Sequence, residues 1–245
     1  MNKLPQITAF FWIMKICATT LGETAGDLLS MTLNVGYAIS SLLLIGIFLV
    51  TLITQLQSKS HNPLLYWTVI LSTSTAGTTM SDYMDRTLGL GYAKGSLILV
   101  SILLIILAFW KFTVGSLSVT NIKTLRVELL YWTAILFSNT LGTALGDFLA
   151  DSSGLGFAGG ALLIAFLIAL VLAAYYFTQI SPVLLFWIAF VLTRPLGATM
   201  GDFLTKTHEK GGLGYGTVGS SIVLLSILIV CIVFTTLKHR SREII

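Results

Sequence analysis

Long apolar runs follow one another along the chain, separated by short stretches that contain glycine or charged residues. The runs 35–54 and 156–178 contain no charged residue, and each reaches the length of about 20 residues that a helix needs to cross a bilayer. The whole pattern predicts eight membrane-spanning helices in four pairs. The first helix of each pair is expected at 8–30, 65–86, 130–151 and 185–206, and the second at 36–57, 91–113, 156–178 and 214–237.

A Trp-Gly-Asp pattern recurs in the first helix of every pair. Each tryptophan is followed by a glycine ten residues later and by an aspartate fifteen residues later. The tryptophans are Trp12, Trp67, Trp132 and Trp187, the glycines Gly22, Gly77, Gly142 and Gly197, and the aspartates Asp27, Asp82, Asp147 and Asp202. The chain is therefore expected to be one membrane domain, 1–245, with repeats at 8–57, 64–113, 129–178 and 184–237. Because each unit has two spans, these parallel repeats surround a pseudo-fourfold or twofold axis along the membrane normal, and the fold class is all-α.

Composition supports a membrane protein, since 56% of the residues are hydrophobic and only 10% are charged. Eight Lys and Arg residues lie at the termini and between repeats, against four in the loops within repeats. The positive-inside rule then predicts that both termini are cytoplasmic. The net charge of +4 comes from such flanking residues and does not indicate a nucleic-acid partner. The eight are Lys3, Lys59, Lys111, Lys123, Arg126, Lys238, Arg240 and Arg242.

Each first helix also carries a polar stripe. The positions seven, eleven and fifteen residues after each tryptophan lie on one helical face. The stripe consists of Thr19, Glu23 and Asp27 in the first repeat, Ser74, Thr78 and Asp82 in the second, Asn139, Thr143 and Asp147 in the third, and Arg194, Ala198 and Asp202 in the fourth. Helix packing does not require a carboxylate, and a charge inside a membrane is costly unless it is paired or hydrated. We therefore expect the four stripes to point inward and to form a site.

The predicted site favours a cationic ligand. Within the predicted spans, Glu23 and the four aspartates are opposed only by Lys15 and Arg194, a formal balance of −3. Oxygen and amide ligands suit Mg²⁺, Mn²⁺, Ca²⁺ or H⁺ better than copper or zinc. Mn²⁺ is the favoured ion, although no residue singles it out. The expected metal ligands are Asp27, Asp82, Asp147, Asp202 and Glu23, and the further binding residues are Asn139, Arg194, Thr78 and Thr143.

Some charges occur in one or two repeats only. Glu23 and Arg194 lie on neighbouring helices if the repeats follow one another around the axis, and we expect an ion pair that cation binding breaks. The alternative is that Arg194 only offsets the buried aspartates and holds the bundle together. Lys15 is expected to reach back to the membrane interface, and the repeated tryptophans to be interface anchors and packing residues. Five charged residues lie at or beyond the outer helix ends, and most of them are expected to be solvated; the alternative for Asp85 or Asp151 is an outer vestibule. The five are Asp85, Arg86, Asp151, Lys206 and Glu209.

These repeats resemble a bacterial family of membrane proteins built of four tandem two-helix repeats of unknown function, each with a characteristic tryptophan. The resemblance rests on that residue and on the motif Gly-x-x-x-(Gly/Ser)-Asp in each copy. It implies the four-repeat architecture and a location in the bacterial inner membrane, but no substrate. The chain departs from the pattern at Ser81, at Asn34-Val35 and at a three-residue insertion before Gly214, which suggests that the repeats have acquired different tasks.

The favoured function is a secondary transporter that exports a small divalent cation in exchange for protons. A gated cation channel is one alternative, and a structural or regulatory membrane protein without transport activity is another. An enzyme is not expected, because the sequence contains no nucleophile-and-base set, phosphate loop or haem ligand pair, and no cofactor is expected. The expected partners are the lipid bilayer and the cation. Eight spans can form a complete bundle alone, and a homodimer also stays open.

Overall fold

The computed structural model describes residues 4–119, 122 and 124–243, with side chains described as far as Leu237. This part of the chain is helical and contains no strand. Its long helices are α1 (Ala9–Asp27), α2 (Tyr37–Gln57), α3 (Pro63–Asp82), α4 (Tyr92–Val114), α5 (Leu125–Asp147), α6 (Gly156–Phe177), α7 (Pro182–Thr205) and α8 (Gly216–Glu243). The predicted helices are all present; the first helix of each repeat ends one to four residues earlier than predicted, α5 begins five residues earlier, and α8 extends six residues further. Of the basic residues that predicted the orientation, Lys3 and Lys123 lie outside the described residues.

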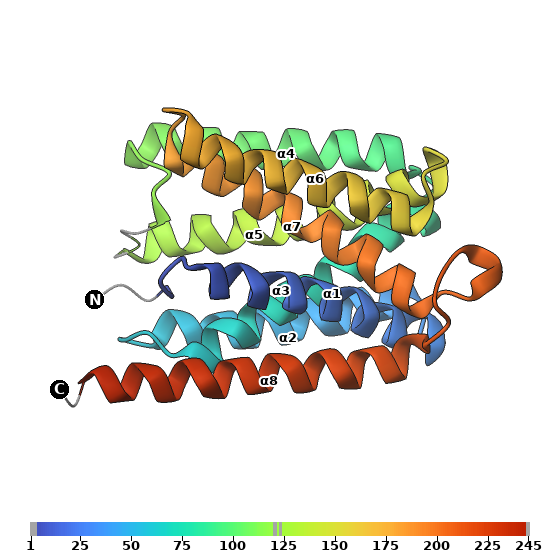
Figure 1. The fold of residues 1–245 in the computed structure, drawn as a ribbon, viewed down its shortest axis with the longest axis horizontal. Helices are drawn as coiled ribbons and strands as arrows, with labels where there is room; N and C mark the ends of the chain where they lie inside the picture. Colours follow the sequence, from blue (N-terminus) through green and yellow to red (C-terminus); the bar gives the residue numbers. More distant parts are fainter. Residues whose placement is uncertain (1–3, 120–121, 123, 244–245) are drawn as a thin grey trace.

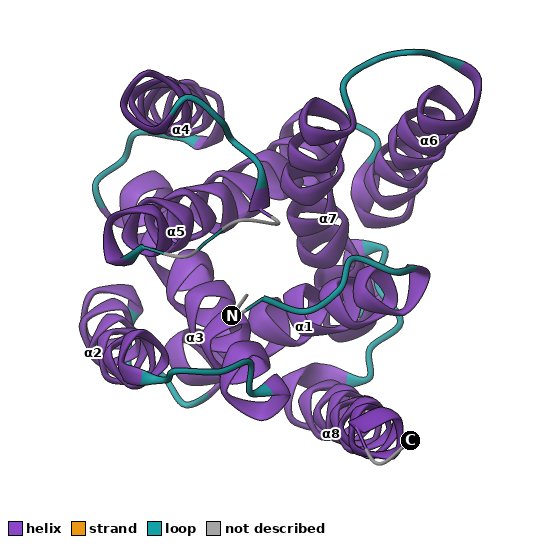
Figure 2. Cartoon of the chain, turned by 90° about the vertical axis from the view of Figure 1, so that its left-hand side faces the viewer, coloured by secondary structure: helices purple, strands orange, loops and turns teal. Residues whose placement is uncertain are grey.

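The odd-numbered helices form a closed inner ring (Figures 1 and 2). Around this ring, α1 contacts α3, α3 contacts α5, α5 contacts α7, and α7 contacts α1. The even-numbered helices lie outside, at the corners of the bundle. Each of them packs most extensively on the inner helix of the next repeat, so α2 packs on α3, α4 on α5, and α6 on α7. Helix α8 packs on α1 and thereby joins the last repeat to the first.

Glycines let the inner helices approach each other closely. A Cβ atom on Gly26 would lie 2.8 Å from Cβ of Thr78 on α3, and one on Gly146 would lie 2.8 Å from Cβ of Ala198 on α7. Between α3 and α5, a Cβ on Gly77 would lie 2.9 Å from a backbone nitrogen. Real Cβ atoms do not come this close, so these positions require glycine. The small residues of the repeated motif are thus the seams of the inner ring.

Five of the described helices are long and apolar enough to cross a membrane: α2, α4, α6, α7 and α8. The outer helices among these expose large apolar side chains such as Leu42, Leu104 and Phe166, as expected for residues that face lipid. Helices α1, α3 and α5 are less apolar because they contain the polar stripes, and these stripes are buried inside the ring. The chain is therefore a helical membrane protein by length and composition.

Three of the four repeated tryptophans are buried in the protein, so these three do not anchor the chain through contact with lipid headgroups. Trp67, Trp132 and Trp187 are at most 3% exposed, and Trp12 is half-buried. Each tryptophan packs against the aromatic residue that precedes another of the four tryptophans in the sequence. These rings form an aromatic cluster at the end of the ring where α1 begins, here called the tryptophan end. The reason is geometric, since residues fifteen positions before an inward-facing aspartate also lie close to the inner side of the ring. The packing role of these residues is confirmed.

The helices of the inner ring end in two different ways. In the first three repeats, the α-helix ends at the motif aspartate and continues as a five-residue π-helical turn, at Leu28–Thr32, Tyr83–Thr87 and Phe148–Ser152. In the fourth repeat, α7 continues as an α-helix to Thr205, and Lys206 is in an extended conformation with φ −71° and ψ 154°. The three-residue insertion therefore changes the backbone directly after Asp202.

Candidate functional site

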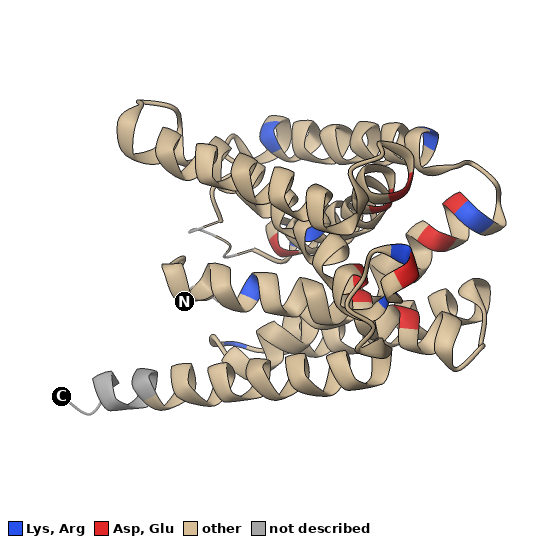
Figure 3. Ribbon diagram, turned by 45° about the vertical axis from the view of Figure 1, so that its right-hand side comes forward, with Lys and Arg blue, Asp and Glu red and all other residues tan. Residues whose placement is uncertain are grey.

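The four motif aspartates gather at the end of the ring opposite the tryptophans, here called the aspartate end (Figure 3). Asp27, Asp82, Asp147 and Asp202 are each at most 3% exposed. Their helices place them there because each lies at the last residue, or near the last residue, of an inner helix. The predicted inward orientation of the polar stripes is therefore confirmed at these positions.

Two basic side chains bridge the aspartates in pairs. The guanidinium of Arg86 contacts Asp82 (Nε to Oδ1, 3.0 Å) and Asp147 (Nη2 to Oδ2, 2.9 Å). The ammonium of Lys206 contacts Asp202 at 3.0 Å and Asp27 at 2.6 Å. Each basic residue thus binds the aspartate of its own repeat and that of the next repeat around the ring. The site has a pseudo-twofold arrangement, with a bridge between α3 and α5 and another between α7 and α1.

These bridges correct the prediction that Arg86 and Lys206 are solvated, and they correct the charge balance. Their side chains are only 29% and 18% exposed. Counting both residues, the five carboxylates are opposed by four basic groups, and the formal balance is −1 and not −3. Burial lowers the pKa of the Lys206 amine, but Asp202 and Asp27 raise that pKa by more, so the net shift is upward. Lys206 is therefore charged at neutral pH.

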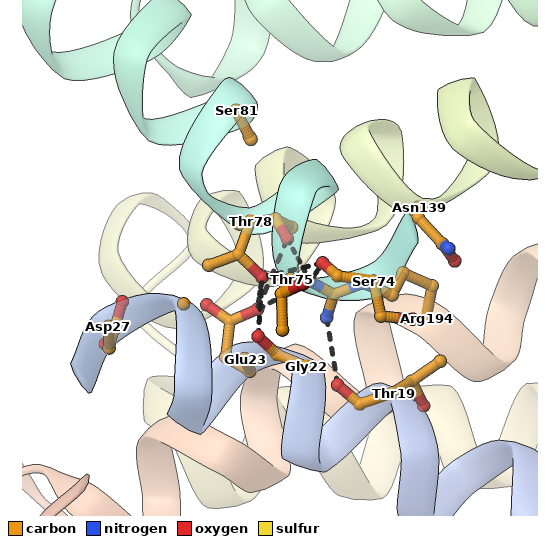
Figure 4. Close-up of polar contacts among 12 residues, drawn as sticks. Thr19, Gly22, Glu23, Asp27, Ser74, Thr75, Thr78, Ser81, Asn139 and Arg194 are labelled. Atoms are coloured by element: carbon orange, nitrogen blue, oxygen red, sulfur yellow. Dashed lines mark hydrogen bonds and ion pairs between the residues drawn. The ribbon is translucent and has the colours of Figure 1, made fainter. Parts of the chain in front are cut away.

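The predicted ion pair between Glu23 and Arg194 is present in the middle of the ring (Figure 4). Nη2 of Arg194 lies 2.9 Å from Oε2 of Glu23, and both side chains are at most 3% exposed. The hydroxyls of Thr78 and Thr143 each donate to the same carboxylate oxygen at 3.2 Å. Arg194 also donates to the Thr19 carbonyl at 3.4 Å and to the hydroxyls of Thr78 and Thr143. This one side chain of α7 therefore contacts α1, α3 and α5.

A subset of the predicted ligands comes close enough to share one cation. Glu23, Asp147 and Asp202 each have a carboxylate oxygen within 4.8 Å of the others, and all three are buried. Asp27 and Asp82 do not belong to this group, although both were predicted as ligands. Oxygen ligands of this kind suit a hard divalent cation. We call Glu23, Asp147 and Asp202 the carboxylate triad.

Asn139 and Lys15 form a separate polar layer nearer the tryptophan end. The carboxamide of Asn139 donates to the Thr73 hydroxyl at 2.9 Å and accepts from the Lys15 amine at 3.4 Å. Lys15 is fully buried, and its nitrogen lies 4.2 Å from the centre of the Phe190 ring. The prediction that Lys15 reaches the membrane interface is therefore wrong. Asn139 lies apart from the Glu23–Arg194 pair, on the side opposite to Asp27 (Figure 4).

The sequence does contain a signal for the two bridging residues. Arg86 and Lys206 stand four positions after Asp82 and Asp202, and residues four apart on a helix lie on the same face. The first and third repeats have Met31 and Asp151 at this position. The basic residue in alternate repeats thus indicates a twofold arrangement. The second aspartate of each bridge lies on the neighbouring helix. The packing of the ring brings it close, so the sequence around the basic residue does not predict it.

Comparisons with known proteins identify the repeat but no activity. A family model described as a Repeat of Unknown Function (DUF347) matches four successive segments, at residues 10–61, 65–116, 130–181 and 185–241. The match confirms the resemblance inferred from the sequence. No curated protein and no solved structure matches the chain.

Proposed function

Since the chain belongs to the DUF347 family, whose description states no activity, we propose that it is a secondary transporter of a small cation. The observation that carries this proposal is the carboxylate triad, in which three buried side chains from three inner helices bring oxygens within 4.8 Å of one another. A soluble core or a packing seam has no need for such a group, and intramembrane carboxylates of this kind mark ion pathways.

All eight helices cross the membrane in this proposal. The inner helices α1, α3 and α5 bury their polar faces in the ring and are covered by the outer helices, which supply the lipid-facing surface. The first residues of α1 and the last of α8 lie at the same end of the bundle (Figure 1). The bias of Lys and Arg places that end in the cytoplasm of a bacterium, with the chain in the inner membrane.

A hard divalent cation is the substrate class that fits the ligands, with Mn²⁺ as the favoured ion. Around the carboxylate triad, the five carboxylates are opposed by Arg86, Arg194 and Lys206, because Lys15 lies in the separate polar layer, and the local formal balance is −2. One divalent ion would neutralise this balance, but it must compete with the basic groups that already contact the carboxylates. Export in exchange for protons fits such a site, because the same carboxylates can carry either ion.

Side-chain contacts close both ends of the ring, as a transporter or a gated channel in its closed state requires. At the tryptophan end, the Tyr66 and Tyr131 hydroxyls are hydrogen-bonded at 2.8 Å beneath a cavity of about 300 Å³ that residues 4–7 help to line. At the aspartate end, Arg86 and Lys206 cover the carboxylates. Alternating access then requires each end to open in turn.

A structural role is the second candidate, and the contacts of Arg194 favour it. This side chain contacts all three other inner helices, so the buried polar network can serve to hold the ring together. In that case the carboxylates stabilise the fold and no ion moves.

Flux of Mn²⁺, Mg²⁺, Ca²⁺ and Zn²⁺ into proteoliposomes, with and without a pH gradient, tests the transporter proposal. We expect pH-dependent, saturable flux of one ion that is abolished by Asp147→Asn. Asp151→Asn is the matched control, because Asp151 is exposed on the turn that follows Asp147, and it should leave the flux unchanged. Flux that does not saturate would favour a channel. The absence of flux for every ion in a well-folded protein would refute the proposal in favour of the structural role.

A further inference from the structure

The two bridging residues are equivalent in the repeat but are held differently. Beyond its two aspartates, Arg86 donates to the Tyr37 hydroxyl at 3.3 Å. Its guanidinium also lies 5.9 Å and 5.7 Å from the ring centres of Tyr37 and Tyr92. Within the described part of the chain, the Lys206 side chain contacts only the sulfur of Met31, at 4.0 Å, besides its two aspartates. A planar guanidinium between aromatic rings is fixed in position, whereas an ammonium on a four-carbon chain moves freely once its ion pairs break.

The backbone around Arg86 is also held more firmly than the backbone around Lys206. Arg86 lies inside a π-helical turn that continues α3 without a break. Lys206 is the first residue after α7, and it begins the loop 206–215 that contains the insertion. Glycines with positive φ do not distinguish the two segments, since Gly89 and Gly91 after Arg86 share this conformation with Gly211 and Gly214 after Lys206.

The loop is attached to the end of α7 through the backbone of Lys206 and its neighbours. Leu213 donates to the Phe203 carbonyl at 2.7 Å, and Gly214 donates to the Lys206 carbonyl at 2.9 Å. In Figure 1 this loop projects from the aspartate end beyond the neighbouring turns. Tyr215 also donates to the Leu204 carbonyl at 3.0 Å, and the Lys206 amide donates to the Asp202 carbonyl at 2.8 Å. The Lys206 side chain can therefore leave Asp27 and Asp202 only if the loop and this last backbone bond of α7 shift together.

We propose that Lys206 is a tethered competitor, whose ammonium occupies the position between Asp27 and Asp202 until a divalent cation enters and the loop 206–215 withdraws it. This inference rests on the proposed function and deepens it. Asp202 belongs to both the ammonium bridge and the carboxylate triad, so the lysine and the cation compete for the same carboxylate. Arg86, held by two tyrosines, stays in place and keeps the other half of the site assembled.

Binding of Mn²⁺ to the purified full-length protein in detergent tests the competition directly. Lys206→Gln removes the competing charge, and we expect its apparent Kd for Mn²⁺ to fall about tenfold, as for a site that is about one-tenth available in the wild type. Lys206→Arg keeps the charge and should retain a Kd close to that of the wild type. Arg86→Gln is the matched comparison in the equivalent repeat, and it should not tighten binding.

Amine labelling of the unmodified sequence tests the movement without any variant. A membrane-impermeant, amine-reactive reagent is applied with and without saturating Mn²⁺, and modification is quantified by peptide mass spectrometry. Modification of Lys206 should rise several-fold with Mn²⁺, while Lys210, which is exposed on the same loop, should not change. Labelling of Lys206 that stays constant, together with equal Kd values for the wild type and Lys206→Gln, would overturn the tethered competitor and leave the transporter proposal standing. If no variant binds or transports any cation, both proposals fail.

Discussion

At the scale of single residues, the centre of the ring depends on one buried ion pair that four helices share. The Glu23 carboxylate forms an ion pair with Arg194 at 2.9 Å and accepts hydrogen bonds from the hydroxyls of Thr78 and Thr143 at 3.2 Å. Buried pairs contribute little net stability relative to an apolar pair, but a single partner left alone is strongly destabilising. The two residues are therefore expected to behave as one unit.

A double-mutant cycle on this pair should show strong coupling. Glu23→Gln or Arg194→Gln alone is expected to lower the free energy of unfolding by about 3–5 kcal/mol, because each leaves an unpaired buried charge. The double variant should lose less stability than the sum of the two, while cation flux should be lost in both variants that lack Glu23, which is a member of the carboxylate triad. Thermal unfolding in detergent and proteoliposome flux measure the two effects. Additive losses would contradict a coupled pair.

The sequence predicted this pair but not the two bridges at the aspartate end. Glu23 and Arg194 were found because each breaks the repeat inside a predicted span. Arg86 and Lys206 also break it, but they lie at the helix ends, where charged residues are ordinarily hydrated. Their burial depends on the aspartates of neighbouring helices, which only the closed ring brings within 3 Å. Lys15 was misjudged for a similar reason, since its inward direction follows from packing against Phe190.

At the scale of elements, the periodicity of apolar and polar residues predicts the helices well but not the turns that follow the inner helices. These turns are π-helical in the first three repeats and differ in the fourth, which contains the three-residue insertion. The expected helices 36–57 and 156–178 agree closely with α2 and α6. The π-helical turns after the first three motif aspartates have no simple signal in hydropathy. Membrane helices pack through small residues, and this rule correctly predicts the seams between the inner helices.

Substitution of a seam glycine should therefore cost stability that an equivalent substitution elsewhere does not. Gly26→Ala places a methyl group 2.8 Å from Cβ of Thr78, so α1 and α3 must move apart. We expect a loss of about 1–3 kcal/mol, the usual cost of overpacking. Gly46→Ala in α2 is the control, because nothing lies within 4 Å of its Cβ, and it should be neutral or slightly stabilising. Thermal unfolding of the two variants in detergent measures the difference, and equal stability would show that Gly26 is not a required seam.

At the scale of the whole molecule, the outer helices link successive repeats and α8 completes the circle. Ser221 of α8 donates to the Thr24 hydroxyl of α1 at 2.8 Å, and the Cys17 thiol donates to the Leu224 carbonyl at 3.5 Å. The sequence predicts four two-helix repeats but not which helices pack together, and in the structure each outer helix packs mainly on the inner helix of the next repeat. Hydropathy cannot indicate this choice, because both neighbouring inner helices offer similar apolar surfaces.

A chain truncated after Lys210 should lose most of its folded material, because α1 then exposes the surface that α8 covers. Expression of residues 211–245 as a separate polypeptide in the same cells should restore the fold and the flux. Size-exclusion chromatography in detergent measures the folded fraction. A truncated chain as stable as the full-length protein would contradict the role of α8 in covering α1.

The contact between α8 and α1 also has a consequence for biogenesis. Helix α8 is synthesised after the other long helices described here, so the surface of α1 that it covers is left uncovered while the chain is being made. The inner ring itself does not wait for α8, because α7 contacts α1 directly. The nascent bundle therefore carries an unprotected strip of α1, which includes Cys17 and Thr24, until the last contact forms.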